Sequence, residues 1–215
     1  NLLIAKYIKG ECDFSDPRTI FCRGLVLNAH NLQPVMVPPE KSQKFPFFLQ
    51  NVVKDNWSEV IIEEFIDGTM INACCVSGEW IISTKSIIGA GCSWSSSKKF
   101  SEMFDEAKGD LDLERLNPKL TYSFVLRHPE NRIVTEYEKA DMVLVQVRQG
   151  YTEIDTYIIA KNLKENGIEV VVPKRYIHSS LESVLNQLSD MNYQEQGLVF
   201  KYGGVRSKLR NEKYN

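Results

Sequence analysis

The chain has 215 residues, of which 43% are hydrophobic and 25% are charged, and its formal net charge is −2 at pH 7. A chain of this length and composition is typical of a globular protein that buries a full core. The balanced charge excludes a general electrostatic attraction to nucleic acid, so any such binding would depend on a local basic pocket.

Six short runs rich in Val, Ile, Tyr and Phe are predicted to be strands. In chain order they are residues 24–28, 59–65, 70–76, 79–86, 121–127 and 142–148. Turns with Asp-Gly, Ser-Gly and Pro-Glu-Asn lie between them. Short strands separated by such turns favour antiparallel sheets over a parallel α/β fold.

Three segments between and after these strands are predicted to be helices. Residues 96–109 close on Gly109, and residues 155–167 open on an Asp-Thr cap and close on Gly167. Residues 179–191 have a Ser cap and an apolar stripe at helical spacing, which predicts a core-facing helix rather than a cofactor-binding segment. Strands and helices in this order give an α+β fold with antiparallel sheets.

The organisation of the chain indicates one domain over residues 1–215, because no repeat, linker or low-complexity block interrupts it. The chain starts at Asn1 rather than at Met and stops at Asn215, shortly after a basic motif. We therefore expect it to be a segment of a longer polypeptide. No apolar stretch approaches the roughly 20 residues that span a bilayer, so we expect no membrane partner.

The cysteines predict the redox environment. They are odd in number and include an adjacent pair, without the CxxC spacing of a zinc site; they are Cys12, Cys22, Cys74, Cys75 and Cys92. We expect buried or half-buried free thiols in a reducing, intracellular compartment.

The sequence "FIDGT" (65–69) is the centre of a larger pattern. Asp-Gly between two apolar runs is by itself only a hairpin signal. Other segments accompany it in a fixed order: "CRGLVLN" (22–28), "TYSFVLRHPENRIV" (121–134), "DMVLVQVR" (141–148), "EQGLVFK" (195–201) and "SKLRNEKY" (207–214). Together these resemble the phage-type RNA ligase family, which includes the ligase domain of fungal-type tRNA ligase. The resemblance covers almost all of the chain and implies a covalent lysine nucleotidyltransferase fold.

The resemblance also implies a chemistry that this chain lacks the residues to perform. In the family a lysine two residues before the Asp-Gly pair attacks the α-phosphate of ATP, and two acidic positions position divalent cations. The lysine position here is Phe65, and the acidic positions are Val125 and Gln196. We therefore predict no catalytic residue and no metal site, and we expect the Phe65 ring to fill part of the space that lysine or adenine occupies in the family. The family's upstream Pro-Lys-Phe-Phe element is altered as well, because "KFPFF" (44–48) places Pro46 before the aromatic pair.

Most of the phosphate-contacting pattern is retained. Lys208 and Arg210 are two residues apart, hence on one face of a strand, and match the family's last motif. The predicted nucleotide- or phosphate-binding set is Arg23, Glu64, Asp67, Gly68, Lys201, Lys208 and Arg210. Cations without the acidic positions suit a phosphate, or ATP, that binds without metal. The alternative interpretation of the same Lys and Arg residues is a solvent-exposed strand face that binds no ligand.

Other polar and aromatic residues carry less weight. His30, His128 and His178 belong to no recognisable motif. Trp80, Trp94 and Tyr122 have rings that stack on bases in other proteins, but core or rim packing is the favoured interpretation.

Three functions follow from these patterns. The preferred one is a catalytically dead RNA-ligase-like module that is retained for binding or for structure, with other proteins of a larger assembly as partners. An RNA-end binder without chemistry overlaps with it and has RNA or a nucleotide as its partner. The alternative is an active ATP-dependent RNA ligase with a displaced nucleophile, for which Lys44, Lys54 and Lys85 are the candidates.

Overall fold

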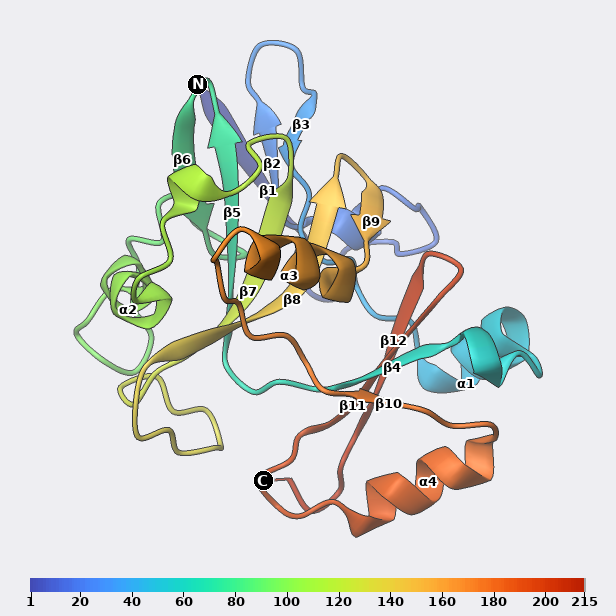
Figure 1. Ribbon diagram of the computed structural model, residues 1–215. Coiled ribbons are helices and arrows are strands. Elements are labelled where there is room, and N and C mark those ends of the chain that lie inside the picture. The colour runs from blue at the N-terminus through green and yellow to red at the C-terminus, as the bar shows by residue number, and fades with distance from the viewer. Residues whose placement is uncertain (215) are drawn as a thin grey trace. The chain divides into compact units, whose positions relative to one another are not determined.

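The computed structural model describes residues 1–214, and they form two compact units. The first unit contains residues 1–40, 68–132 and 136–172, and the second contains residues 41–67, 133–135 and 173–215. Figure 1 shows that both units combine antiparallel strands with short helices. The α+β prediction is confirmed.

The first unit contains two sheets and two helices. Its three-stranded sheet has the order β1-β2-β3, and its five-stranded sheet has the order β6-β5-β7-β8-β9. The strands are β1 (Leu2–Lys6), β2 (Arg23–Asn28), β3 (Pro34–Met36), β5 (Thr69–Val76), β6 (Glu79–Ser83), β7 (Thr121–Arg127), β8 (Asp141–Gln149) and β9 (Thr152–Ile154). The helices are α2 (Phe100–Lys108) and α3 (Thr156–Glu165), with 3₁₀ turns at Thr19–Phe21 and Leu113–Arg115.

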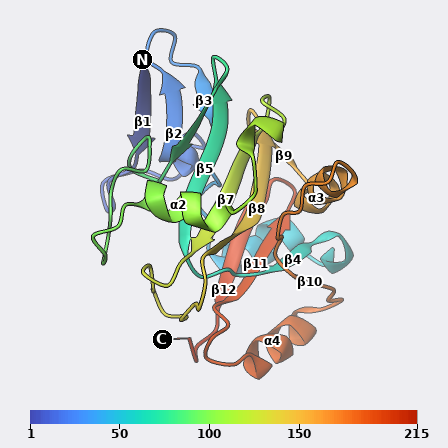
Figure 2. The same cartoon turned by 60° about the vertical axis from the view of Figure 1, so that its left-hand side comes forward.

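The main core of the first unit lies on one face of the five-stranded sheet. Alternate residues of the strands, such as Ile71 on β5 and Phe124 on β7, point to this face and are almost fully buried. Phe104 of α2 and Leu163 of α3 pack against the same cluster, so both helices cover one face of the sheet (Figure 2). Burial of this apolar area is the main stabilising contribution in the unit.

The second unit is a four-stranded sheet with helices packed on one side. The strand order is β10-β4-β11-β12, and the elements are β4 (Ile61–Glu64), β10 (Arg175–Tyr176), β11 (Gly197–Tyr202), β12 (Val205–Arg210), α1 (Phe45–Phe48) and α4 (Leu181–Asp190). A π-helical turn at Leu49–Val53 and a 3₁₀ turn at Trp57–Glu59 complete it. Phe48 and Val184 pack with Ile62, Leu198 and Phe200 in the core, which leaves the opposite sheet face to polar residues.

The three predicted helices are confirmed, although each is shorter than its prediction. Asp155 caps α3 by accepting the N–H of Tyr157 at 2.8 Å, and Ser180 caps α4 by accepting that of Ser183 at 3.2 Å. The six predicted strands are also present, with the run at 59–65 reduced to β4 because a 3₁₀ turn precedes it.

Two motif glycines are required by close backbone approach. A Cβ atom on Gly68, which has φ +148°, would lie 2.3 Å from the carbonyl oxygen of Leu126. A Cβ atom on Gly197, which has φ +138°, would lie 2.1 Å from that of Leu209. Only glycine fits at these positions, so the motif glycines at both sites have a structural reason that does not depend on catalysis.

The cysteines have the states that the sequence predicts. All five are free; Cys74 is buried and the others are half-buried. Burial raises the pKa of the Cys74 thiol to about 12.

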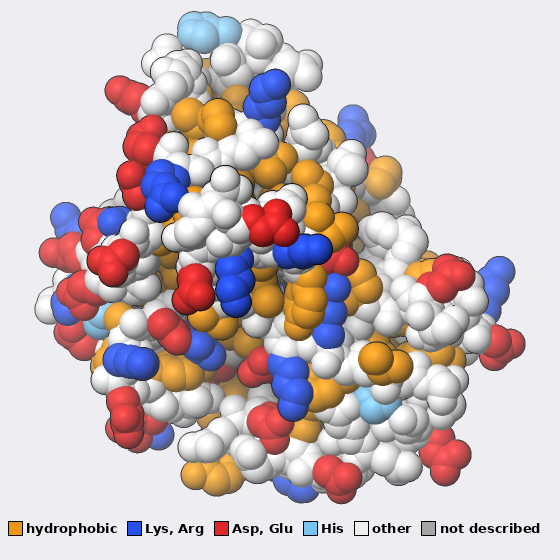
Figure 3. Space-filling model, viewed as in Figure 1, with side chains coloured by type: hydrophobic (Ala, Val, Ile, Leu, Met, Phe, Trp, Pro, Cys, Tyr) orange, Lys and Arg blue, Asp and Glu red, His pale blue; other side chains and the backbone are white. Residues whose placement is uncertain are grey.

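Within residues 1–214, no helix has the length and apolar character needed to cross a bilayer. Acidic and basic side chains are interspersed on the face that Figure 3 shows, as the small net charge predicts.

Candidate phosphate-binding site

The polar side of the second unit's sheet carries five cations and one buried carboxylate. We call it the basic face; it consists of Glu63, Arg175, Lys201, Arg206, Lys208 and Arg210. The pairing of the strands explains the grouping. Lys201 is the cross-strand partner of Arg206, and Val199 is the partner of both Lys208 and Glu63. Directly paired residues share a face of an antiparallel sheet, so the six side chains lie on one side.

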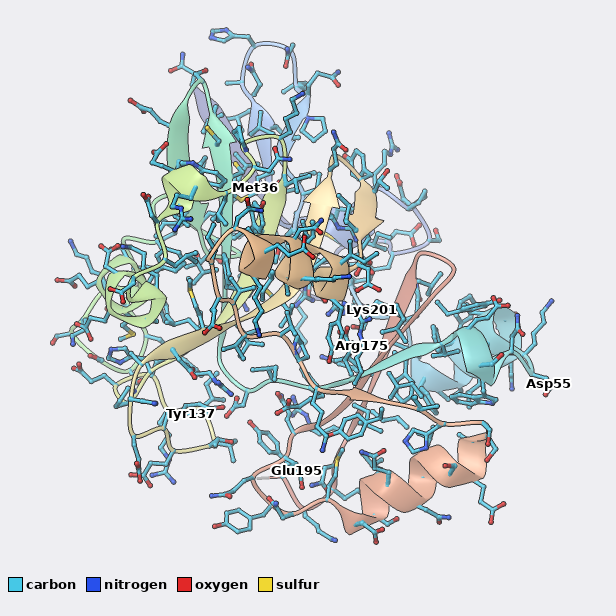
Figure 4. All side chains as sticks on the ribbon, viewed as in Figure 1. Met36, Asp55, Tyr137, Arg175, Glu195 and Lys201 are labelled. Carbon is cyan, nitrogen blue, oxygen red and sulfur yellow. The ribbon has the colours of Figure 1, made fainter. Side chains whose placement is uncertain are left out.

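Glu63 of β4 forms ion pairs with cations of the two neighbouring strands, β10 and β11. Its Oε1 lies 3.1 Å from Nε of Arg175, and its Oε2 lies 3.0 Å from Nζ of Lys201. Arg175 and Lys201 lie beside each other in Figure 4. The side chains of Glu63 and Lys201 are only 2% and 9% exposed, and a buried ion pair of this kind is costly to break because the remaining charge has no partner.

Phe65 directly follows β4, and its equivalence with the lysine of the resembled family stays a prediction. The backbone N–H of Phe65 donates to the carbonyl oxygen of Gly197 at 3.0 Å, which ties it to the strand that follows Gln196. The ammonium of Lys208 lies 5.0 Å from the centre of the Phe65 ring, within cation–π range. The Phe65 ring is half-buried, whereas the sequence predicts a ring that fills part of the nucleotide pocket of the family.

The other residues of the "EFIDG" segment have structural contacts. The carboxylate of Asp67 is buried and accepts the backbone N–H groups of Val134 at 3.2 Å and Thr135 at 2.9 Å. Glu64 pairs with Leu198, on the face opposite Glu63, and accepts the N–H of Lys174 at 3.3 Å. Burial, assisted by the Glu64 charge, raises the pKa of the Tyr176 hydroxyl. Ligand binding by Glu64, Asp67 and Gly68 stays a prediction.

The remaining predicted site residues are divided between the two units. In the first unit, Arg23 donates to the Tyr7 hydroxyl at 3.2 Å and lies over its ring, while Val125 is buried on β7. In the second unit, Gln196 is buried, and its Oε1 has no hydrogen-bond partner within residues 1–214. Arg210 is exposed on β12 and lies over the Tyr214 ring.

The "HPEN" segment (128–131) forms a braced turn in the first unit. His128 is buried; its Nδ1 accepts the N–H of Glu130, so its Nε2 is the atom that donates to Glu106 at 2.7 Å. This hydrogen bond is the main cause of the lowered pKa of Glu106. Hydrogen bonds to Glu130 and Glu106 raise the pKa of Lys98 to about 12. Asn131 then donates to the Thr69 hydroxyl at 2.8 Å, which fixes the start of β5.

The "LVQVR" segment of β8 supplies a second buried network to the same unit. Arg148 forms an ion pair with Glu40, and both side chains are 5% exposed. Arg148 also donates to Gln146 at 2.9 Å and to the Tyr151 carbonyl oxygen at 2.6 Å. Both segments therefore stabilise the fold by contacts within the first unit.

The histidines and aromatic residues with weak sequence signals pack within the fold or lie on its surface. His178 hydrogen-bonds Ser183 at 2.6 Å and also contacts Gln187 of α4, and His30 is exposed. Tyr122 is a core residue, with Trp80 packed against the same cluster, whereas Trp94 is 67% exposed. Core packing is thus confirmed for Tyr122 and Trp80.

The arrangement of donor side chains determines whether the chain can hold a metal ion. Among residues 1–214, no group of three or more His, Cys, Asp or Glu side chains is placed to hold a metal ion. Of the two positions that are acidic in the resembled family, Val125 has no donor atom and Gln196 has a neutral carbonyl. These residues do not fit a divalent cation, and no step of the function proposed below uses one.

Three members of the basic face were missed from the sequence: Glu63, Arg175 and Arg206. Glu63 and Phe65 are two residues apart, so strand alternation places them on one face and signals Glu63 rather than Glu64. Arg175 and Arg206 have no comparable signal, because their place depends on the pairing of β10 with β4 and of β12 with β11.

Comparison with solved structures defines the class of fold. The chain has the fold of solved ATP-dependent RNA and DNA ligases. An archaeal ATP-dependent RNA ligase aligns with a TM-score of 0.62 and 16% identity over 88% of this chain and 52% of its own. A Naegleria gruberi RNA ligase variant with ATP and Mn aligns with a TM-score of 0.62 and 11% identity over 82% and 56%. The resemblance drawn from the motifs is confirmed at the level of the fold.

A curated relative extends the comparison to sequence. The "Putative bifunctional polynucleotide kinase/RNA ligase" of Autographa californica nuclear polyhedrosis virus is 25% identical over 233 residues, covering all of this chain and 33% of the relative. The chain thus spans a third of that protein and about half of the solved ligases. No family model matches the chain.

Proposed function

We propose that this chain is an RNA-ligase-like nucleotidyltransferase domain that has lost adenylyl transfer and acts as a binding or structural module. The observation that carries the proposal is Phe65 at the nucleophile position, with the Lys208 ammonium on its ring. A phenyl ring has no lone pair with which to attack a phosphate.

The distribution of retained residues supports the same proposal. The glycines at 68 and 197 and the networks around Asn131 and Arg148 remain, and each has a structural contact. The positions that changed are those whose role in the resembled family is chemical: Phe65, Val125 and Gln196. Loss confined to the chemistry indicates a fold that is kept for another purpose.

The ligand of this module is proposed to be a phosphate group of a nucleotide or of RNA, bound without metal. Lys208 and Arg210 are exposed on β12 and point to the basic face. A guanidinium and an ammonium on adjacent same-face positions suit phosphate oxygens. The curated relative and the solved neighbours are named as RNA ligases, one of them with ATP, which supports a nucleotide or RNA as the partner. A role within a larger protein assembly is proposed from the sequence alone.

An active ligase with a displaced lysine is the competing function. Lys44, Lys54 and Lys85 are exposed; the first two flank the helical segment 45–53 of the second unit, and the third belongs to the first unit. Lys208 is the lysine with a ring contact to Phe65, so it is added to these candidates.

Calorimetric titration with ATP, with and without Mg²⁺, tests the binding proposal. We expect weak binding that changes little on adding Mg²⁺, because the acidic positions are lost, and that is lost in Lys208→Ala. Lys161→Ala, an exposed lysine on α3, is the matched control and should bind as the unmodified chain does. A large gain in affinity with Mg²⁺ would show that other carboxylates hold a metal ion and would contradict the proposal.

A further inference from the structure

Arg206 is a buried cation whose charge is not matched within its own unit. It is 8% exposed, and its Nη1 has no hydrogen-bond partner within residues 1–214. No salt bridge joins it to an acidic side chain in that part of the chain. Taking a guanidinium out of water without an acceptor or a counter-charge is costly, so the position calls for a ligand that supplies both.

The surroundings of Arg206 identify the charge of that ligand. Its cross-strand partner is Lys201, so the two side chains leave the sheet on the same face. Glu63 is the carboxylate of this face, and its two oxygens are already engaged by Arg175 and Lys201. A neutral acceptor would satisfy Nη1 but leave the charge of Arg206 unmatched, whereas an anion would satisfy both.

We propose that Arg206, with Lys201 beside it, forms an interior binding site for a small oxyanion of the phosphate class. The planar guanidinium presents parallel N–H donors that match two oxygens of a phosphate, and the ammonium adds a point charge. The site is distinct from the Lys208–Arg210 pair, because those two side chains are exposed whereas Arg206 is buried. It goes beyond the function proposed above, since it requires neither a nucleotide nor the loss of adenylyl transfer.

Titration of the chain with inorganic phosphate at constant ionic strength tests this site, with calorimetry and thermal unfolding as readouts. We expect phosphate to bind and to raise Tm with concentration, and Arg206→Gln to weaken binding by at least about tenfold because a charged hydrogen-bond donor is lost. Arg206→Lys should retain part of the affinity. Arg132→Gln, on the surface of the first unit, is the matched control and should bind phosphate as the unmodified chain does.

Two outcomes of the phosphate titration would overturn the proposed site. Absence of phosphate binding by the unmodified chain would mean that water satisfies Arg206, and it would overturn the site even if Arg206→Gln failed to fold. Equal binding by a folded Arg206→Gln would overturn it as well. Competition identifies the source of the phosphate. Displacement of inorganic phosphate by ATP without metal supports the site and indicates a nucleotide. Displacement by a 5′-phosphorylated but not by a 5′-hydroxyl RNA dinucleotide supports the site and indicates an RNA end. An adenylylation assay remains independent of every one of these results.

Discussion

At the residue scale, the contact between Phe65 and Lys208 is the feature on which the proposed loss of adenylyl transfer depends. The Phe65 ring is half-buried and lies 5.0 Å from the Lys208 ammonium. A cation–π contact at a partly exposed site is worth about 0.5–1 kcal/mol, and burial of part of the ring adds to it. Phe65 therefore stabilises the basic face in the place where a lysine would repel Lys208.

Phe65→Lys alone is expected to lower the free energy of unfolding by about 1–3 kcal/mol, from lost ring burial and from repulsion with Lys208. It should give no ligase activity, because Val125 and Gln196 are unchanged. Urea denaturation measures the stability, with Phe65→Tyr as the control that keeps a ring. An unchanged unfolding midpoint for Phe65→Lys would show that the ring contributes nothing to stability.

Motif order in the sequence singles out Phe65, Val125 and Gln196, and the loss of chemistry at these positions stays a prediction. The partners on the basic face are not predictable from motif order. Glu63 is signalled only by the alternation of the strand, which places it on the same face as Phe65. Arg206 carries no sequence signal, since its burial depends on tertiary structure.

At the scale of elements, the basic face is held together by Glu63, which joins β4 to β10 and β11 through its ion pairs. Alternation along β11 and β12 sends apolar side chains to the core with α1 and α4 and cations to the other side. The same four strands thus build the hydrophobic core and the candidate site, and a change that disturbs Glu63 should affect both.

Glu63→Gln should cost about 3 kcal/mol of stability, because it removes a buried carboxylate charge that pairs with Lys201 and Arg175. Glu59→Gln, an exposed residue before the same strand, is the control and should be near neutral. Thermal and chemical unfolding measure both variants. Equal stability of the two variants would show that the ion pairs of Glu63 contribute nothing to the free energy of unfolding.

Gly197→Ala should be at least about 2 kcal/mol more destabilising than Gly203→Ala, because the added methyl meets the Leu209 carbonyl oxygen. Gly203 is the mild control, because its φ of +57° lies in the left-handed helical region and nothing lies within 4 Å of a Cβ atom there. Equal costs in urea denaturation would show that neither the clash nor the φ of +138° at Gly197 adds to the destabilisation.

Sequence patterns identified the long strands and the capped helices because these elements carry local signals, such as the Asp155 and Ser180 caps. The six predicted strands leave out β1, β3, β9, β10, β11 and β12, and the four-residue helix α1 is not predicted either. Helix α1 contains Pro46 near its start and is held by packing of Phe45 and Phe48 on Phe200. Tertiary contacts rather than local propensity form these short elements.

At the scale of the whole molecule, the residues that hold the fold together differ from those at motif positions 65, 125 and 196. The buried network around Arg148, the braced turn at Asn131 and the motif glycines each act within one unit and maintain the ligase fold. The proposal of a binding module rests on this separation, since a fold under no requirement would have lost structural and chemical residues alike.

The most direct test is the intact mass of the chain after incubation with ATP and Mg²⁺ or Mn²⁺, with peptide mapping of any adduct. The triple variant Phe65→Lys, Val125→Glu, Gln196→Glu is measured beside it, because it returns the nucleophile and both acids together. We predict that the unmodified chain keeps its mass under every condition, because position 65 offers no amine. A stoichiometric, acid-labile gain of one adenylyl group on Lys44, Lys54, Lys85, Lys208 or any other lysine would contradict the account and establish an active ligase with a displaced nucleophile.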